Sequence, residues 1–197
     1  MQRPSLFTIT LPVLLGYIPL GITFGFLMVS QGIAWYIPIL FSIFVFAGAA
    51  QFLAVGLVVN HASLLDTAIA TFLINLRHVF YGLSLFDFLP HTWAKRLYFM
   101  FGITDETYSL LTSSKSANPS NALPIVALNQ SYWVAGTAIG ALLATSLPPI
   151  KGIEFSLTAL FVILLVEQIR ANHETKTVAI VYFYKFTFNA NSLSWSS

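Results

Sequence analysis

Residues Pro4–Leu65 read PSLFTITLPVLLGYIPLGITFGFLMVSQGIAWYIPILFSIFVFAGAAQFLAVGLVVNHASLL, a run of 62 residues without a single Asp, Glu, Lys or Arg. The apolar core of a signal peptide has only about 7–15 residues, so this run is far too long to be one. Because a membrane-spanning helix needs about 20 apolar residues, the run must fold back at least once. The only turn-like interruption is Ser30-Gln31-Gly32, so we predict one span at about Phe7–Val29 and a second at about Ile33–Val59.

The composition of the whole chain is that of a membrane protein. Of 197 residues, 57% are apolar and only 8% are charged, with a mean hydropathy of +0.79, whereas a soluble domain carries about 25% charged residues. The net charge of +2 is too small for an electrostatic nucleic-acid binder. The absence of cysteine excludes a disulfide scaffold and any Cys-ligated metal or haem site. We therefore expect no metal and no cofactor.

The arrangement of apolar segments predicts an all-α fold, a polytopic membrane helix bundle with about five or six transmembrane helices, some of them discontinuous. Further spans are expected at about Ser63–Leu85, Leu123–Ser146 and Gly152–Ile169. Tyr98–Ser113 would rise only about 24 Å as a helix, short of the ~30 Å hydrocarbon core, so a short or broken span or a re-entrant piece is expected there. The orientation depends on this segment, because the Lys/Arg bias between the two sides reverses if it does not cross.

The predicted span Ser63–Leu85 contains the densest set of polar residues. An ionisable residue at the centre of a span costs about 2.5–3.5 kcal/mol, so such residues face the bundle interior or water and are functional candidates. Arg77 and Tyr81 are four apart on one helix face, while Asn75 and His78 form a neighbouring stripe. Arg77 can hold a carboxylate through its planar guanidinium, and His78 can carry a proton near neutral pH. Alternatively, Arg77 snorkels or pairs with a carboxylate to hold two helices together.

Asp105 and Glu106 form a second set of candidates, followed by further polar residues on the same helix face. A buried carboxylate at Asp105 would neutralise Arg77, bind an ammonium group or titrate. For Glu106 the alternative is a helix that enters the headgroup layer with its carboxylate in water.

Small residues mark two more segments. Gly48-Ala49-Ala50-Gln51 indicates either close helix packing or a discontinuous helix whose free backbone groups meet a substrate. In the first span, Pro19 with Gly21 and Gly25 indicates a kinked, closely packed helix. Near the start of the fifth segment, the polar and aromatic residues 129–133 are interpreted as an interfacial anchor, with a substrate stack as the alternative.

Four motifs occur in a fixed order along the chain: Gly16-Tyr-Ile-Pro-Leu-Gly-Ile-Thr-Phe-Gly25, Phe46-Ala-Gly-Ala-Ala-Gln-Phe52, Asn75-Leu-Arg-His78 and Thr104-Asp-Glu-Thr-Tyr108. Together they make the chain resemble the AzlC family of branched-chain amino acid permeases. The resemblance covers about residues 11–170, which is most of the chain.

The resemblance implies a multi-pass permease of the inner membrane that exports Leu, Val, Ile and their analogues. It implies a secondary transporter rather than an enzyme, acting in the lipid bilayer with a small AzlD-type membrane protein and without nucleic acid. Carried over onto this chain, the substrate-binding or coupling candidates are Gln51, Asn75, Arg77, His78, Asp105 and Glu106.

Beyond about residue 170 the chain departs from the family pattern and looks truncated or altered. The apolar run 178–188 is too short for a spanning helix and is β-branched and aromatic, a composition typical of strands. We expect a membrane transport domain over residues 1–176 and an atypical C-terminal tail over 177–197. The alternative to a permease is a truncated, non-transporting membrane protein that retains the permease fold.

Overall fold

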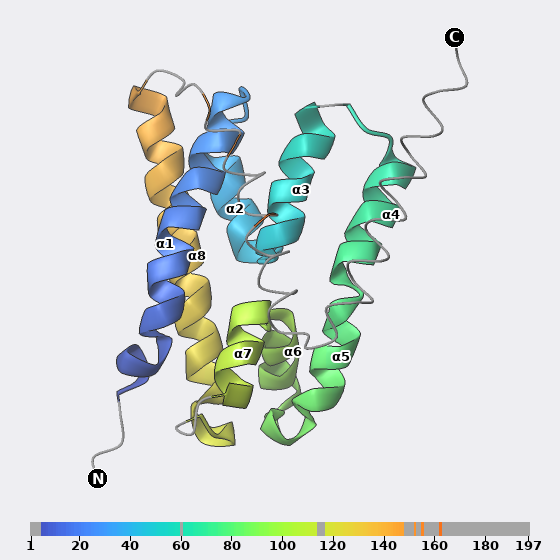
Figure 1. Ribbon diagram of the computed structural model, residues 1–197, viewed down its shortest axis with the longest axis vertical. Helices are drawn as coiled ribbons and strands as arrows, with labels where there is room; N and C mark the ends of the chain where they lie inside the picture. The colour runs from blue at the N-terminus through green and yellow to red at the C-terminus, as the bar shows by residue number, and fades with distance from the viewer. Residues whose placement is uncertain are drawn as a thin grey trace. The chain divides into compact units, whose positions relative to one another are not determined.

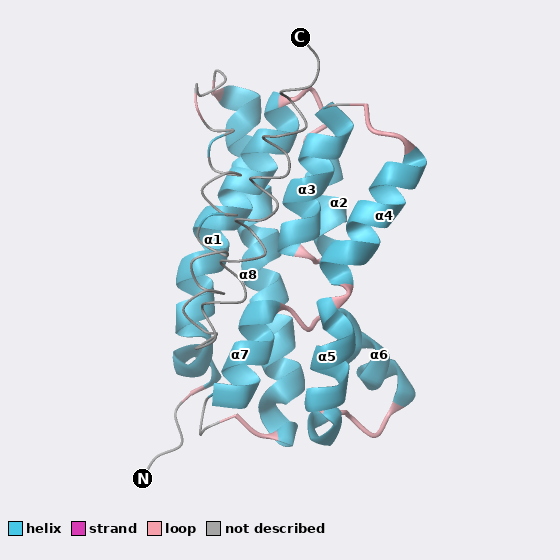
Figure 2. Cartoon of the chain, turned by 45° about the vertical axis from the view of Figure 1, so that its right-hand side comes forward, coloured by secondary structure: helices cyan, strands magenta, loops and turns pink. Residues whose placement is uncertain are grey.

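The computed structural model describes residues 5–59, 61–113 and 117–147, together with 152, 155 and 162. The chain divides into two compact units, Met1–Lys151 and Gly152–Ser197, and the helices described below belong to the first. Throughout the described residues the secondary structure is helical, without strands, which confirms the all-α prediction (Figure 2). The predicted span 152–169, apart from three single positions, and the tail 177–197 lie outside the described residues.

The first predicted span corresponds to a single helix, α1, which runs from Leu6 to Ser30. The Ser5 side chain caps it by accepting a hydrogen bond from the backbone N–H of Thr8. Its 25 residues rise about 38 Å, enough to cross a hydrocarbon core. Among the described helices it is the one that is both long enough and apolar enough to do so. The chain then turns at Gly32, whose φ of +83° is open to glycine without steric cost.

The second predicted span is wrong as a single helix, because the structure divides it into α2, Tyr36–Phe44, and α3, Gly48–Val59. Helices of 9 and 12 residues rise only about 14 and 18 Å, so neither crosses alone. The break includes Phe46, whose φ of +37° lies in the left-handed region and ends the helical path. The Gln51 Nε2 donates to Ser42 Oγ at 3.1 Å, which joins α2 and α3 as a hairpin. We call this pair the first hairpin.

The third predicted span corresponds to two consecutive helices, α4 at Leu64–Asn75 and α5 at Arg77–Ser84, separated at Leu76. A short 3₁₀ turn, η1, follows at Phe86–Phe88. In Figures 1 and 2, α4 and α5 follow one another in nearly the same direction. The chain therefore continues in the same general direction after this break, whereas it reverses in the first hairpin.

The segment of uncertain crossing is broken, with α6 at Trp93–Phe101 and α7 at Asp105–Ser113. These helices also form a reversal, the second hairpin, with residues 102–104 at its tip. Phe101, at the end of α6, contacts the first hairpin at Phe46, while α7 returns along α8. The re-entrant alternative for this segment therefore agrees with the structure, and Figure 1 shows the two hairpins in opposite halves of the unit.

The longest helix is α8, Pro119–Ser146, which packs side by side with α1 (Figure 1). Two glycines on each helix make this close approach possible. A Cβ at Gly21 would lie 2.8 Å from the carbonyl oxygen of Trp133, and one at Gly136 would lie 2.7 Å from that of Ile18. Gly25 and Gly140 extend the same face, so both helices carry the spacing of small residues that lets membrane helices touch through their backbones.

This packing overturns the interfacial-anchor interpretation of residues 129–133. Trp133 is only 3% exposed, and Asn129 and Tyr132 are also buried. The Tyr132 hydroxyl lies 2.9 Å from Thr10 Oγ1 of α1. Aromatic residues at a membrane surface stay in the headgroup layer, whereas these are enclosed because α8 lies directly on α1.

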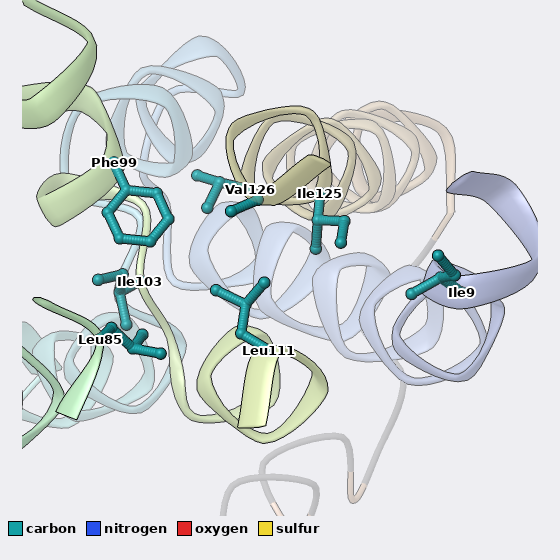
Figure 3. Close-up of a cluster of buried hydrophobic side chains, with 8 residues drawn as sticks. Ile9, Leu85, Phe99, Ile103, Leu111, Ile125 and Val126 are labelled. Carbon is teal, nitrogen blue, oxygen red and sulfur yellow. The ribbon is translucent and has the colours of Figure 1, made fainter. Parts of the chain in front are cut away.

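An apolar cluster holds the second hairpin against the α1–α8 pair. Figure 3 shows Leu111 of α7 directed toward Ile125 and Val126 of α8, with Phe99 of α6 nearby. Ile9 of α1 completes the connection to the first helix. Because side chains from four helices are buried in this cluster, the tip of the second hairpin has a fixed position relative to α1 and α8. The tip in turn positions the polar residues that follow it.

Candidate substrate site

An ion pair connects the two interrupted segments in the middle of the first unit. Arg77, the first residue of α5, pairs with Asp105, the first residue of α7. The Tyr81 hydroxyl donates to the other oxygen of the same carboxylate. The Arg77 and Asp105 side chains are 33% and 29% exposed, so the pair is not fully enclosed by the described residues. The spacing of Arg77 and Tyr81 on one helix face is confirmed by their shared partner.

Local breaks in the helices explain why these groups are available. Arg77 begins a new helix because α4 ends at Asn75, and Asp105 begins α7 because the chain reverses at the tip of the second hairpin. A carboxylate in the first turn of a helix is favourable, since the unpaired amides carry partial positive charge. Stacking of Tyr81 on Tyr108, with ring centroids 4.5 Å apart, holds α5 and α7 in register.

Glu106 has different partners from its neighbour. The Tyr17 hydroxyl, from the middle of α1, donates to Glu106 Oε2 at 2.6 Å and lies 2.6 Å from Thr104 Oγ1. The Tyr17 ring also packs on Trp133 and on Phe46 of the first hairpin. Tyr17 therefore touches both hairpin tips, and the headgroup alternative for Glu106 does not fit a carboxylate bonded to the buried centre of α1.

His78 and Asn75 lie beside the ion pair without joining it. His78 Nδ1 is 3.1 Å from the Asn75 carbonyl oxygen, and its ring lies 5.6 Å from the Tyr81 ring. His78 also lines an apolar cavity of about 350 Å³ between α5, η1 and α6, to which Gly82 and Ile103 contribute. Asn75 faces a separate groove along α4.

Gln51 belongs to a different network, between the first hairpin and α8. Its Nε2 donates to Ser42, whose Oγ lies 2.9 Å from Thr137 Oγ1. Its Oε1 is buried and has no hydrogen-bond partner among the described residues. The structure thus brings Arg77, Asp105 and, through Tyr17 and Thr104, Glu106 to the joint of the second hairpin, while the contacts of Gln51 are those of helix packing.

Sequence reasoning missed Tyr17. The residue stands in an apolar run, and its position between Gly16 and Gly21 indicated only helix packing. Its hydroxyl is nonetheless the link between α1 and the second hairpin. A polar atom on an otherwise apolar face of a predicted span was the available signal.

The site presents donors and acceptors together. Arg77 offers a guanidinium whose Nε is unpartnered among the described residues, and Asp105 offers a carboxylate. Within the described part of the chain, no group of three or more His, Cys, Asp or Glu side chains is placed to hold a metal ion. The arrangement suits a small solute with both a negative and a positive group.

These features are those of a helical membrane protein, built from a close helix pair and two hairpins around a charged centre. A family model described as AzlC protein matches residues 12–147. The chain belongs to the AzlC family, which is a family of transport proteins rather than enzymes.

Three relatives are also named as membrane or transport proteins. The chain is 35% identical to a protein of Bacillus subtilis named branched-chain amino acid transport protein AzlC, over 83% of this chain and 66% of the relative. It is 35% identical to an uncharacterized membrane protein of Helicobacter pylori, over 87% and 78%. It is 30% identical to the inner membrane protein YgaZ of Escherichia coli, over 77% and 67%. No solved structure matches the chain significantly. The protein is a multi-pass membrane protein.

Proposed function

We propose that the protein exports branched-chain amino acids as a secondary transporter, together with a small AzlD-type membrane partner. The observation that carries this proposal is the partly exposed Arg77–Asp105 pair, which joins the interrupted segments α4–α5 and α6–α7. The similarity to the Bacillus subtilis branched-chain amino acid transport protein supports the choice of substrate.

A free amino acid carries a carboxylate and an ammonium group, which match the two charges of the site. The substrate carboxylate binds the Arg77 guanidinium and the ammonium binds Asp105, so the substrate replaces the ion pair with two new ones. Arg77 is suited to this exchange because its planar fork of donors fits a carboxylate. Tyr81 keeps its hydrogen bond to Asp105 and holds that carboxylate in position.

The aliphatic side chain of the substrate needs an apolar surface beside the charges. The cavity of about 350 Å³ lined by His78, Gly82 and Ile103 supplies one, and it is connected to the charges through His78, whose ring lies near that of Tyr81, the hydrogen-bond donor to Asp105. Branched side chains gain free energy by leaving water, at about 25 cal/mol for each Å² of apolar surface. We expect such an apolar lining to favour Leu, Val and Ile over polar amino acids.

The test is efflux of labelled valine from preloaded cells and from proteoliposomes, with and without the AzlD-type partner. Arg77→Gln removes the charge and leaves a shorter side chain that still ends in a polar amide. Loss of a charged hydrogen-bonding partner costs about 1.5–3 kcal/mol, so valine affinity should fall roughly 10- to 150-fold. Resistance of the cells to a toxic leucine analogue should be lost while the protein still inserts.

Arg96→Gln is the matched control, because Arg96 is exposed on α6 and its one described side-chain bond is a long one to the Pro90 carbonyl oxygen. Efflux by this variant should equal that of the wild-type protein. A wild-type protein that inserts but moves no branched-chain amino acid, even beside the partner, would refute the proposal in favour of the non-transporting alternative. Unchanged valine affinity in Arg77→Gln would remove Arg77 from the site.

A further inference from the structure

Two adjacent carboxylates at the start of α7 have different electrostatic surroundings. Asp105 is neutralised by Arg77. Glu106 receives a hydrogen bond from the neutral Tyr17 hydroxyl, and no Lys, Arg or His within the described residues lies in ion-pair range of it. The substrate proposal uses the first carboxylate and leaves the second without a role.

Glu106 is positioned by elements that are far apart in the sequence. Tyr17 comes from the centre of α1, where its ring is buried between Trp133 and Phe46. Thr104, at the tip of the second hairpin, lies within 2.6 Å of the same hydroxyl. The Thr104 hydroxyl is also 3.1 Å from Thr107, which accepts a bond from Asn129 of α8. The carboxylate is thus held by a continuous network rather than directed into water.

The groups that face Glu106 from the surrounding elements leave its charge without a counter-ion of its own. They comprise Tyr17 from α1, Thr104 and Asp105 from the second hairpin, and, beyond Asp105, Arg77 and Tyr81 from α5. The positive charge of Arg77 is already matched by Asp105, and α8 contributes uncharged Asn129 through Thr107. A carboxylate that is removed from water and lacks a counter-ion needs a cation or a proton to offset its charge.

We propose that Glu106 is the proton-binding site that couples transport to a proton gradient, separate from the pair that grips the amino acid. The inference rests on the proposed transport function and assigns its coupling residue. Ionisable groups within membrane helices that lack a counter-ion serve such relays. One proton binds the Glu106 carboxylate from one side of the membrane and leaves to the other.

The position of Glu106 explains how its charge affects the fold. Its bond to Tyr17 joins α1 to the tip of the second hairpin, next to the Phe46–Phe101 contact between the two hairpins. An ionised Glu106 accepts a strong charge-assisted bond from Tyr17, whereas a protonated one accepts a weaker bond. Proton binding therefore loosens the joint between α1 and the hairpin that carries Asp105, and this biases the site between two arrangements.

The experiment compares wild-type protein, Glu106→Gln and Asp87→Asn in proteoliposomes with the partner present. Glutamine keeps the shape of the protonated side chain and still accepts the Tyr17 bond. Asp87, an exposed carboxylate of η1, is the matched control. Two fluxes are measured with labelled valine: net movement driven by an imposed pH gradient, and exchange of internal for external valine without a gradient.

For wild-type and Asp87→Asn protein we expect valine movement driven by the pH gradient and exchange that varies with pH. For Glu106→Gln we expect gradient-driven movement at the level of protein-free vesicles, together with valine exchange that no longer varies with pH. Infrared difference spectra between low and high pH should lose the protonated-carboxyl band of Glu106 in Glu106→Gln, whereas Asp87→Asn should keep this band.

Three other results would each overturn a different claim. Glu106→Gln protein that still follows the pH gradient would overturn the coupling role and leave the proposed function intact. Wild-type movement driven by a sodium gradient, and not by a pH gradient, would overturn the assignment of a proton. Wild-type protein that neither exchanges nor moves valine would overturn both this inference and the proposed function.

Discussion

Removing the Tyr17 hydroxyl is the sharpest test of how the second hairpin is held. Tyr17→Phe keeps the ring that packs on Trp133 and Phe46 but removes a bond of 2.6 Å to Glu106 and a contact of 2.6 Å with Thr104. A bond to a neutral group contributes about 0.5–1.5 kcal/mol and one to a charged group about 1.5–3 kcal/mol. We therefore expect the free energy of unfolding to fall by about 2–4.5 kcal/mol.

The assay is unfolding in mixed micelles with increasing SDS, followed by tryptophan fluorescence. Two further tyrosines provide a graded series. Tyr98→Phe loses one bond of 2.7 Å to Gln130 at a partly buried position, so a fall of about 0.5–1.5 kcal/mol is expected. Tyr36 is 48% exposed, and Tyr36→Phe should stay within about 0.5 kcal/mol of wild type. A Tyr17→Phe protein as stable as Tyr36→Phe would refute the idea that this hydroxyl ties the hairpin to α1.

Two more predictions follow from the backbone. Because the chain contains no cysteine, a single introduced cysteine reports its side of the membrane directly. If α2 and α3 form a hairpin, an impermeant thiol reagent should label Gln31→Cys and His61→Cys from the same side of the membrane and His91→Cys from the other side. Labelling of Gln31→Cys and His61→Cys from opposite sides would mean that the segment between them crosses once. The Gly25→Leu side chain would collide with the α8 backbone, so this variant should lower the free energy of unfolding by about 1–3 kcal/mol in the same SDS titration. Gly16→Leu is the control and should change the free energy of unfolding little, because a Cβ at Gly16 has open space. Equal stability of the two variants would contradict the close α1–α8 contact.

Sequence reasoning singled out the polar residues of the candidate site but misplaced some of their surroundings. It found the ionisable residues Arg77, Asp105 and Glu106 because charges are rare and costly in an apolar chain. It treated 33–59 as one span because hydropathy sums over a window and does not register where the chain reverses. The reversal depends on Phe46 in a left-handed conformation, which apolar composition does not reveal. The interfacial interpretation of Trp133 failed for a similar reason, since burial depends on which helix packs against it.

The amino-acid sequence by itself determined that this chain is a membrane protein, because the transfer of apolar side chains from water to lipid is nearly additive along the chain. Its motifs also placed it in the AzlC family, and its apolar segments predicted the helices seen throughout the described residues. Only the tertiary structure decided that two segments reverse as hairpins, that Asp105 pairs with Arg77 28 positions away, and that Glu106 meets Tyr17 instead of a cation. These contacts join residues that are distant along the chain, and their geometry depends on how α1, α8 and the hairpins pack together.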